Sequence, residues 1–214
     1  MTAKNTPSPV TQLAQLSTVD RLNMITNAFI LFCRGLHRTV QPGMGRWHKN
    51  DNETEIYIAG MEPDEGEALN NKPRIIVQRL AAQWGGRSIG QQQTFGIFTG
   101  SKIFTDLISC PVVIRCIARE GLEAQRIAWD LSRMILVFRP EIYRAGRMQN
   151  INTGKMQISA ETAMGAGVIR SSPNPEYKEV SLVLPVFFEE TVVRDDSEFY
   201  AQIVAVLTGT ATAD

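Results

Sequence analysis

Histidine and cysteine, the side chains most often used for catalysis and metal binding, are scarce in this chain. His37 and His48 are the only histidines, and neither has a partner at a spacing used by metal sites. Cys33, Cys110 and Cys116 form no Cys-x-x-Cys pair, and we interpret Cys110 and Cys116 as small buried hydrophobes, which fits a reducing compartment. We therefore predict no catalytic residue, no resident metal and no cofactor.

Four carboxylates gather in the segment EPDEGE: Glu62, Asp64, Glu65 and Glu67. Oxygen ligands of this type bind Mg²⁺ or Ca²⁺, but the ligand alternation of an EF-hand loop is missing. We interpret the segment as a solvated acidic loop, and cation binding stays open.

Two glycine clusters resemble phosphate-binding loops only in composition. GMGRWH (43–48) and GAGVIR (165–170) lack the strand-to-helix context that a phosphate cradle requires, and the sequence has no Gly-x-Ser-x-Gly elbow. Both clusters are typical of turns.

A basic segment carries Arg139, Arg144 and Arg147. Such charges complement the dipole at the end of a preceding helix. The alternative is a positive surface that meets Asp64 and Glu65 in the acidic loop of a neighbouring copy.

A glycine-rich segment, residues 81–104, is longer than most loops in compact domains. It predicts a hairpin or an extended arm, folded on its own sheet or contacting a neighbour. Its candidate contact residues are Gln91, Gln92, Gln93, Phe95 and Phe98.

Length and charge narrow the class of protein. The 214 residues predict one domain over 17–195, with a loose arm at 1–16 and a short helix and polar tail at 196–214. A net charge of zero disfavours non-specific phosphate binding. The polar start of the chain and the short apolar run at 28–33 favour neither secretion nor membrane insertion.

Hydrophobic periodicity predicts the elements that position these residues. Helices are expected from 17 to near Gly35 and over 121–138, where Pro140 stops the second one. The second helix is expected to bury one apolar stripe that begins at Leu122 and ends at Phe138. Strands are expected at 54–60, 74–80, 105–119, 155–162 and 177–195, and Pro111 indicates an edge position or a bulge. This order predicts an α+β fold with a mainly antiparallel sheet covered by the second helix.

The strand at 177–195 is apolar on both faces. Its even positions, from Val180 to Phe188, are expected to meet the covering helix. Its odd face carries the polar residues Glu179 and Ser181 together with Val183, Pro185, Phe187 and Val193, which are unsuited to water. We expect a second subunit to cover Val183, Phe187 and Val193.

The strand TDLISCPVVIRCIAR, the helix EGLEAQRIAWDLSRMILVF, and the later segments MQISAETAMGAGVIR and YKEVSLVLPVFFEETVVRD occur in an order that resembles the tail terminator or neck proteins of tailed bacteriophages. The resemblance extends over about residues 17–195. It matches a pattern of elements and no short motif, and the loop 81–104 and the C-terminal helix have no place in it.

This resemblance implies a non-enzymatic virion protein. It implies a homo-oligomeric ring, commonly of six, that closes the tail tube and joins it to the head connector. The partners would be the tail tube protein and the connector or adaptor protein, with DNA passing through the channel without specific binding. The alternatives are another ring component of the connector or baseplate, or a small cytoplasmic enzyme.

Overall fold

The computed structural model describes residues 18–41, 43, 45–61, 72–84, 94–95, 102–164 and 174–194. The fold is α+β, as predicted. Its elements are α2 (Thr18–Arg38), β1 (Tyr57–Ala59), β2 (Arg74–Arg79), β3 (Gln83–Trp84), β4 (Thr94–Phe95), β5 (Lys102–Ser109), β6 (Val112–Ala118), α3 (Gly121–Val137), α4 (Arg139–Gly146), β7 (Asn150–Ile151), a 3₁₀ turn η1 (Thr153–Lys155), β8 (Gln157–Ile158), β9 (Thr162–Met164), β10 (Asn174–Leu184) and β11 (Val186–Arg194).

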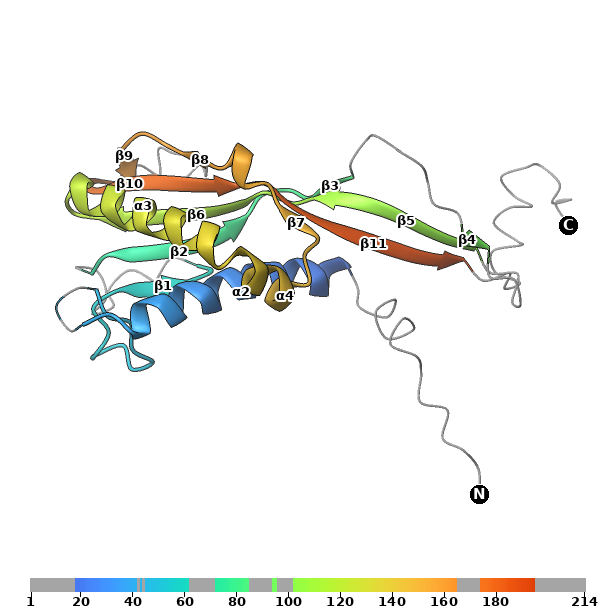
Figure 1. Cartoon of the computed structure of the whole chain (residues 1–214). Helices are drawn as coiled ribbons and strands as arrows, with labels where there is room; N and C mark the ends of the chain where they lie inside the picture. The colour runs from blue at the N-terminus through green and yellow to red at the C-terminus, as the bar shows by residue number, and fades with distance from the viewer. Residues whose placement is uncertain are drawn as a thin grey trace, which may run out of the picture. The chain divides into compact units, whose positions relative to one another are not determined.

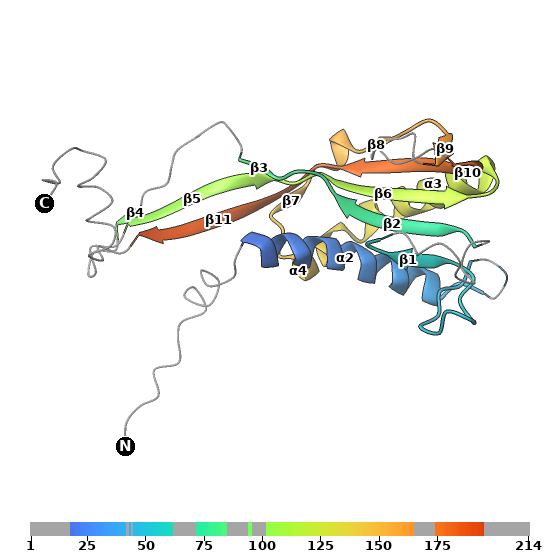
Figure 2. The same ribbon diagram turned by 180° about the vertical axis from the view of Figure 1, so that it is seen from behind.

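A six-stranded sheet has the order β1-β2-β6-β10-β8, with β9 also paired to β10. The pair β1–β2 is parallel, and the other pairs of this sheet are antiparallel. All seven residues of β6 are buried, because this central strand has covered faces on both sides. Figure 1 shows α3 lying across β6 and β10, and Figure 2 shows the same layers from behind.

The helix-covered face of this sheet forms the main core. Cys116 and Val180 are paired neighbours on it, and both are fully buried. The even positions from Val180 to Phe188 are buried, as predicted. The buried apolar side chains here include Ile58, Ile75, Val77, Ile114, Val180, Leu182 and Leu184 from the strands and Ile25, Phe29, Cys33, Ala124, Ala128, Leu131 and Ile135 from the helices.

The opposite face of the sheet has a buried polar network. The guanidinium of Arg115 donates from Nε and Nη2 to the two carboxylate oxygens of Glu179, at 3.0 and 2.8 Å. The hydroxyl of Ser181 donates to Glu179 Oε1 at 2.8 Å. The side chains of Arg115 and Glu179 are each only 1% exposed, so two charges without this pairing would be very costly here.

Two prolines divide the long strands that were predicted as continuous. Pro111 separates β5 from β6, and Pro185 separates β10 from β11. The backbone N–H of Cys110 donates to the Val186 carbonyl at 2.8 Å, and Val112 pairs with Leu184, so the two prolines lie opposite each other. Pro111 is therefore neither on an edge strand nor a bulge.

The carbonyls of both prolines point away from the paired strands and accept hydrogen bonds from flanking segments. Pro111 O accepts from Leu80 N–H, and Pro185 O accepts from Asn152 N–H, both at 2.8 Å. Proline has no N–H, so each strand lacks one outward donor at this level. The outer strands end at the same level, since β2 ends at Arg79.

A second sheet has the order β3-β5-β11-β7, with β4 also paired to β5. The contacts of the chain separate into two compact units. One contains residues 19–83 and 109–188, and the other contains 1–18, 84–108 and 189–214. The single domain expected over 17–195 thus corresponds to parts of two units.

The helices differ from the expected ones in two places. Helix α2 continues past Gly35 to Arg38, because the guanidinium of Arg34 donates twice to the Ile58 carbonyl, at 3.1 and 2.9 Å, and ties this turn to β1. Helix α4 was not predicted, although Pro140 lies in its first turn, where proline is favoured. No helix in the described ranges is long and apolar enough to cross a bilayer. The predicted arm at 1–16 and the predicted C-terminal helix lie outside the described residues.

Candidate functional site

An exposed apolar stripe runs along α3. Leu122, Trp129 and Leu136 are 77%, 54% and 51% exposed. They are seven residues apart, so they lie on one line along the helix. Val137 and Phe138 extend this exposed apolar surface at the end of α3. We call Leu122, Trp129 and Leu136 the α3 stripe.

The amphipathic pattern of α3 explains why the stripe faces outward. Its small and branched residues Ala124, Ala128, Leu131 and Ile135 are buried on the side that contacts β6 and β10. The sequence predicted that Leu122 and Phe138 belong to this buried side, which is wrong, because both are exposed. Phe138 is 38% exposed, and its ring packs against Phe32 of α2 at a centroid distance of 6.1 Å.

A polar half lies beside the stripe on the exposed surface of α3. Arg126 and Asp130 form an i,i+4 contact of 4.0 Å, with side chains 76% and 62% exposed. Exposed pairs of this kind contribute little to stability. The apolar half is therefore the unusual part of this surface, because large exposed apolar patches mark contact sites.

Two of the predicted interface residues lie on the sheet and are half-buried. Val183 pairs with Val113 of β6 and Gln157 of β8, and Phe187 pairs with Asn150 of β7. Pro185 between them is also half-buried. The odd face is thus partly open at these positions, while Glu179 and Ser181 of the same face are buried. For Val193 the structure describes only the backbone, in β11.

The predicted basic surface is solvent-exposed. Arg144 lies in the last turn of α4, and Arg147 follows as its left-handed C-cap with φ 50°. Both positions suit the negative end of a helix dipole. Asp64 and Glu65 lie outside the described residues, so their meeting with a neighbour's arginines stays a prediction.

Most of the predicted contact loop is also outside the described residues. This applies to Gln91, Gln92, Gln93 and Phe98. Phe95 belongs to β4 and pairs with Lys102 of β5, which agrees with a hairpin in this segment.

A cavity of about 500 Å³ lies between α2, α3 and the segment after α2, and His37 is one of its lining residues. His37 Nδ1 donates to the Gly45 carbonyl at 2.9 Å. Burial lowers the pKa of His37, while the Gly45 carbonyl and Asp130 oppose that shift. The described lining residues include Glu123, Arg126 and Asp130 but no serine, threonine, cysteine or lysine, so they offer no hydroxyl, thiol or amine nucleophile.

The turn beside this cavity is built around Glu55. Its carboxylate accepts backbone N–H bonds from Gly43, Gly45 and Arg46 at 2.6, 3.1 and 2.9 Å. These bonds, that from Arg46 foremost, lower the pKa of Glu55. Gly43 and Gly45 have φ of 85° and 80°, which only glycine adopts readily. The Glu55 carboxylate thus has a structural role in holding this turn.

All three cysteines are buried, as predicted for Cys110 and Cys116. Burial raises the pKa of the Cys33 thiol to about 12 and the pKa of Cys116 well above its ordinary value. Thiols in this state are poor nucleophiles. Among the described residues no group of three metal-ligating side chains comes together.

Comparison with known proteins adds no family to these observations. No protein-family model matches the chain, and no curated protein is similar to it in sequence.

The α3 stripe is the feature that sequence reasoning missed. Its signal was the seven-residue spacing of Leu122, Trp129 and Leu136. Periodicity alone could not separate a second apolar line from the buried one, because both lie on the same helix.

Proposed function

We propose that this protein is a structural, non-enzymatic component of a tailed-phage virion. In this proposal it is a tail terminator or neck subunit, and six copies close into a ring. The ring joins the tail tube protein to the connector or adaptor protein and leaves a channel through which DNA passes. The basis for the phage assignment is the order of elements given above.

The observation that carries self-assembly is the α3 stripe. Three large apolar side chains in line on a solvent-facing helix are a poor surface for a monomer. Val183, Pro185 and Phe187 supply a second, half-buried apolar surface on the sheet. A head-to-tail ring needs two different patches on each subunit, because each patch meets a different surface of the neighbour.

The neutral charge of the chain suits the channel. A pore lined by dense lysine and arginine would bind phosphates and slow the passage of DNA. Zero net charge avoids a strong general attraction.

Two alternatives lead to different measurements. Another ring component of the connector or baseplate would also assemble with itself, and would differ in the phage proteins that it binds. Among the described residues, the cavity at His37 is the feature that would favour a small enzyme, and this alternative predicts a ligand in that cavity.

Native mass measurement of the full chain tests the proposal. We expect a ring whose mass is a whole multiple, six in this proposal, of the 23.8 kDa of one chain. A monomer at every concentration, which also fails to add to tail tubes, would rule the proposal out. Ring formation combined with binding to tail tubes but not to baseplates separates it from the first alternative.

A further inference from the structure

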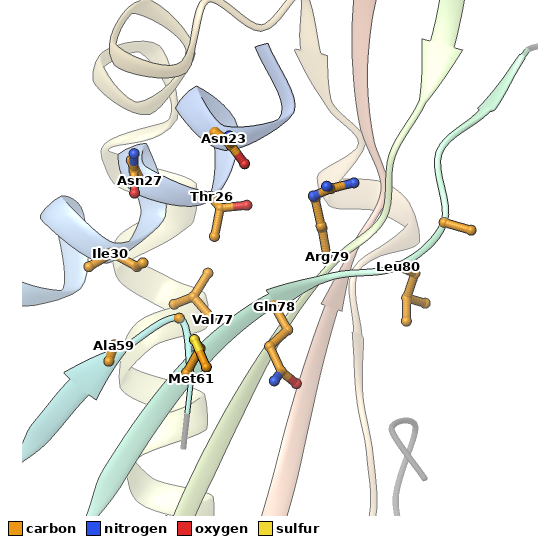
Figure 3. A pocket seen from close by; sticks show the side chains of 12 residues that line it. Asn23, Thr26, Asn27, Ile30, Ala59, Met61, Val77, Gln78, Arg79 and Leu80 are labelled. Atoms are coloured by element: carbon orange, nitrogen blue, oxygen red, sulfur yellow. The ribbon is translucent and has the colours of Figure 1, made fainter. Parts of the chain in front are cut away.

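A groove of about 950 Å³ with both polar and apolar lining residues lies between the first half of α2 and the outer edge of β2. Figure 3 shows Asn23, Thr26 and Asn27 on the helix side, with Val77 and Arg79 of β2 pointing toward that side. Ala59, Gly60 and Met61 close the other end.

The floor of the groove is an unpaired strand edge. β1 pairs with β2 only through Arg74, Ile75 and Ile76. Within the ranges that the structure describes, no strand pairs with Val77 to Arg79 on that side. An exposed edge of this kind is a template for an added strand.

The hydrogen-bond pattern shows which groups the edge offers. Leu80 N–H donates to Pro111 O in the neighbouring strand. Inward and outward groups alternate along an antiparallel strand, so Arg79 directs its N–H and its C=O outward, and Val77 directs its C=O outward. One residue of an incoming strand can therefore exchange two hydrogen bonds with Arg79.

Polar, exposed side chains lie beside this edge, next to the apolar lining residues Ile30, Met61 and Leu80. Arg79, Asn23 and Asn27 are exposed, and the described chain provides no ion pair or hydrogen bond to their side chains. Thr26 donates to Leu22 O within its own helix. The groove thus suits an extended segment with small side chains, hydrogen-bonding groups and a negative charge.

We propose that the C-terminal segment of a second copy of this chain adds to β2 as a strand in this groove. The proposal rests on the proposed function, because it requires self-assembly. Residues 208–213, TGTATA, alternate threonine with glycine or alanine, a period of two that is typical of a strand. Asp214 follows and supplies a carboxylate for Arg79.

The composition and length of this segment fit the site. One face of the strand presents threonine hydroxyls, which hydrogen-bond the amides of Asn23 and Asn27. The other face carries only glycine and alanine, whose side chains are small. Residues 195–214 follow β11, and about 3.3 Å per extended residue gives them a reach of about 65 Å. An unpaired edge and an exchanged strand are two different patches, as a head-to-tail contact requires.

Cysteine cross-linking in co-expressed chains tests the proposal. The native Cys33, Cys110 and Cys116 are fully buried, so introduced thiols react selectively. One chain carries Asn27→Cys in the groove, and a differently tagged chain carries Thr210→Cys or, in a second version, Ala211→Cys. The two versions place the thiol on either face of the strand.

The control is Leu31→Cys, which lies on the same helix, is 65% exposed and does not line the groove. We expect a disulfide between the two tagged chains with Asn27→Cys and not with Leu31→Cys. No disulfide with either tail version overturns the proposal. A single chain that carries both cysteines tests whether the tail binds its own groove. If a disulfide forms only within this chain and not between the two tagged chains, the proposal is also overturned, because the chain's own tail would then fill the groove.

Charge exchange gives a second readout. Arg79→Glu should lower the cross-link yield about fivefold, the effect of losing and reversing one exposed ion pair. Asp214→Lys in the tail-donating chain should restore the yield, and a lack of rescue contradicts the Arg79–Asp214 contact. If rings form without any cross-link, this proposal fails and the proposed function stands. If the chain stays a monomer that does not bind tail tubes, both fail.

Discussion

Replacing Trp129 by alanine should weaken self-association without harming the fold. Trp129 lies at the centre of the α3 stripe and is 54% exposed. Complete burial of a large apolar side chain contributes about 1.5 to 3 kcal/mol, so covering the exposed half contributes about 1 to 2 kcal/mol, including its aromatic packing. At 1.4 kcal/mol per decade, Trp129→Ala should raise the dissociation constant about 5- to 30-fold.

Sedimentation equilibrium or mass photometry over a dilution series measures this constant, and urea unfolding measures stability. The matched control is Arg126→Ala, on the polar half of the same helix, with a side chain 76% exposed. We expect the control to change association less than twofold, by the small contribution of an exposed pair. If Trp129→Ala leaves association unchanged while unfolding stays cooperative, no subunit covers the α3 stripe.

Three further predictions concern stability and the sheet. Arg115→Met should lower the free energy of unfolding by about 3 to 5 kcal/mol, because it leaves Glu179 buried without its partner, whereas adding Glu179→Met should recover most of that loss in urea unfolding. A loss in the double variant as large as in the single one would contradict the pairing. Because burial lowers the pKa of folded His37 below its ordinary 6.5, the folded state binds fewer protons, so stability should fall as the pH drops through 6.5. That part of the pH dependence should vanish in His37→Asn, and an unchanged profile would show that another group causes it. Phe187→Asp should block assembly and keep a native circular dichroism spectrum, whereas unfolding would place Phe187 in the core.

The local sequence pattern was sufficient to predict the buried positions of elements whose apolar residues repeat with a single period. The buried side of α3 and the even positions of β10 follow from spacing alone, since a helix or strand that faces one core must repeat its apolar residues. The same logic assigned Leu122 wrongly. A helix with a core line and a contact line has two apolar lines, and sequence spacing does not say which one meets the sheet.

Features that depend on pairing between distant residues were out of reach. Glu179 was taken as a polar residue on an outer face, because nothing in its neighbourhood names Arg115 as its partner. The division of the strands at Pro111 and Pro185 requires the register of β6 against β10. The groove beside Arg79 exists because β1 is only three residues long. The apolar residues next to β1 in the sequence predicted a longer strand.

The two facing prolines, Pro111 and Pro185, also affect which register β6 and β10 adopt during folding. If β10 shifted by one position against β6, the nitrogen of Pro185 would turn inward, and the pair would lose a rung of its ladder. The same shift would turn the buried apolar side chains of β10 from the helix-covered face of the sheet to the opposite face. A misaligned pairing of β6 and β10 is therefore penalised twice, which should leave the native alignment with few close competitors during folding.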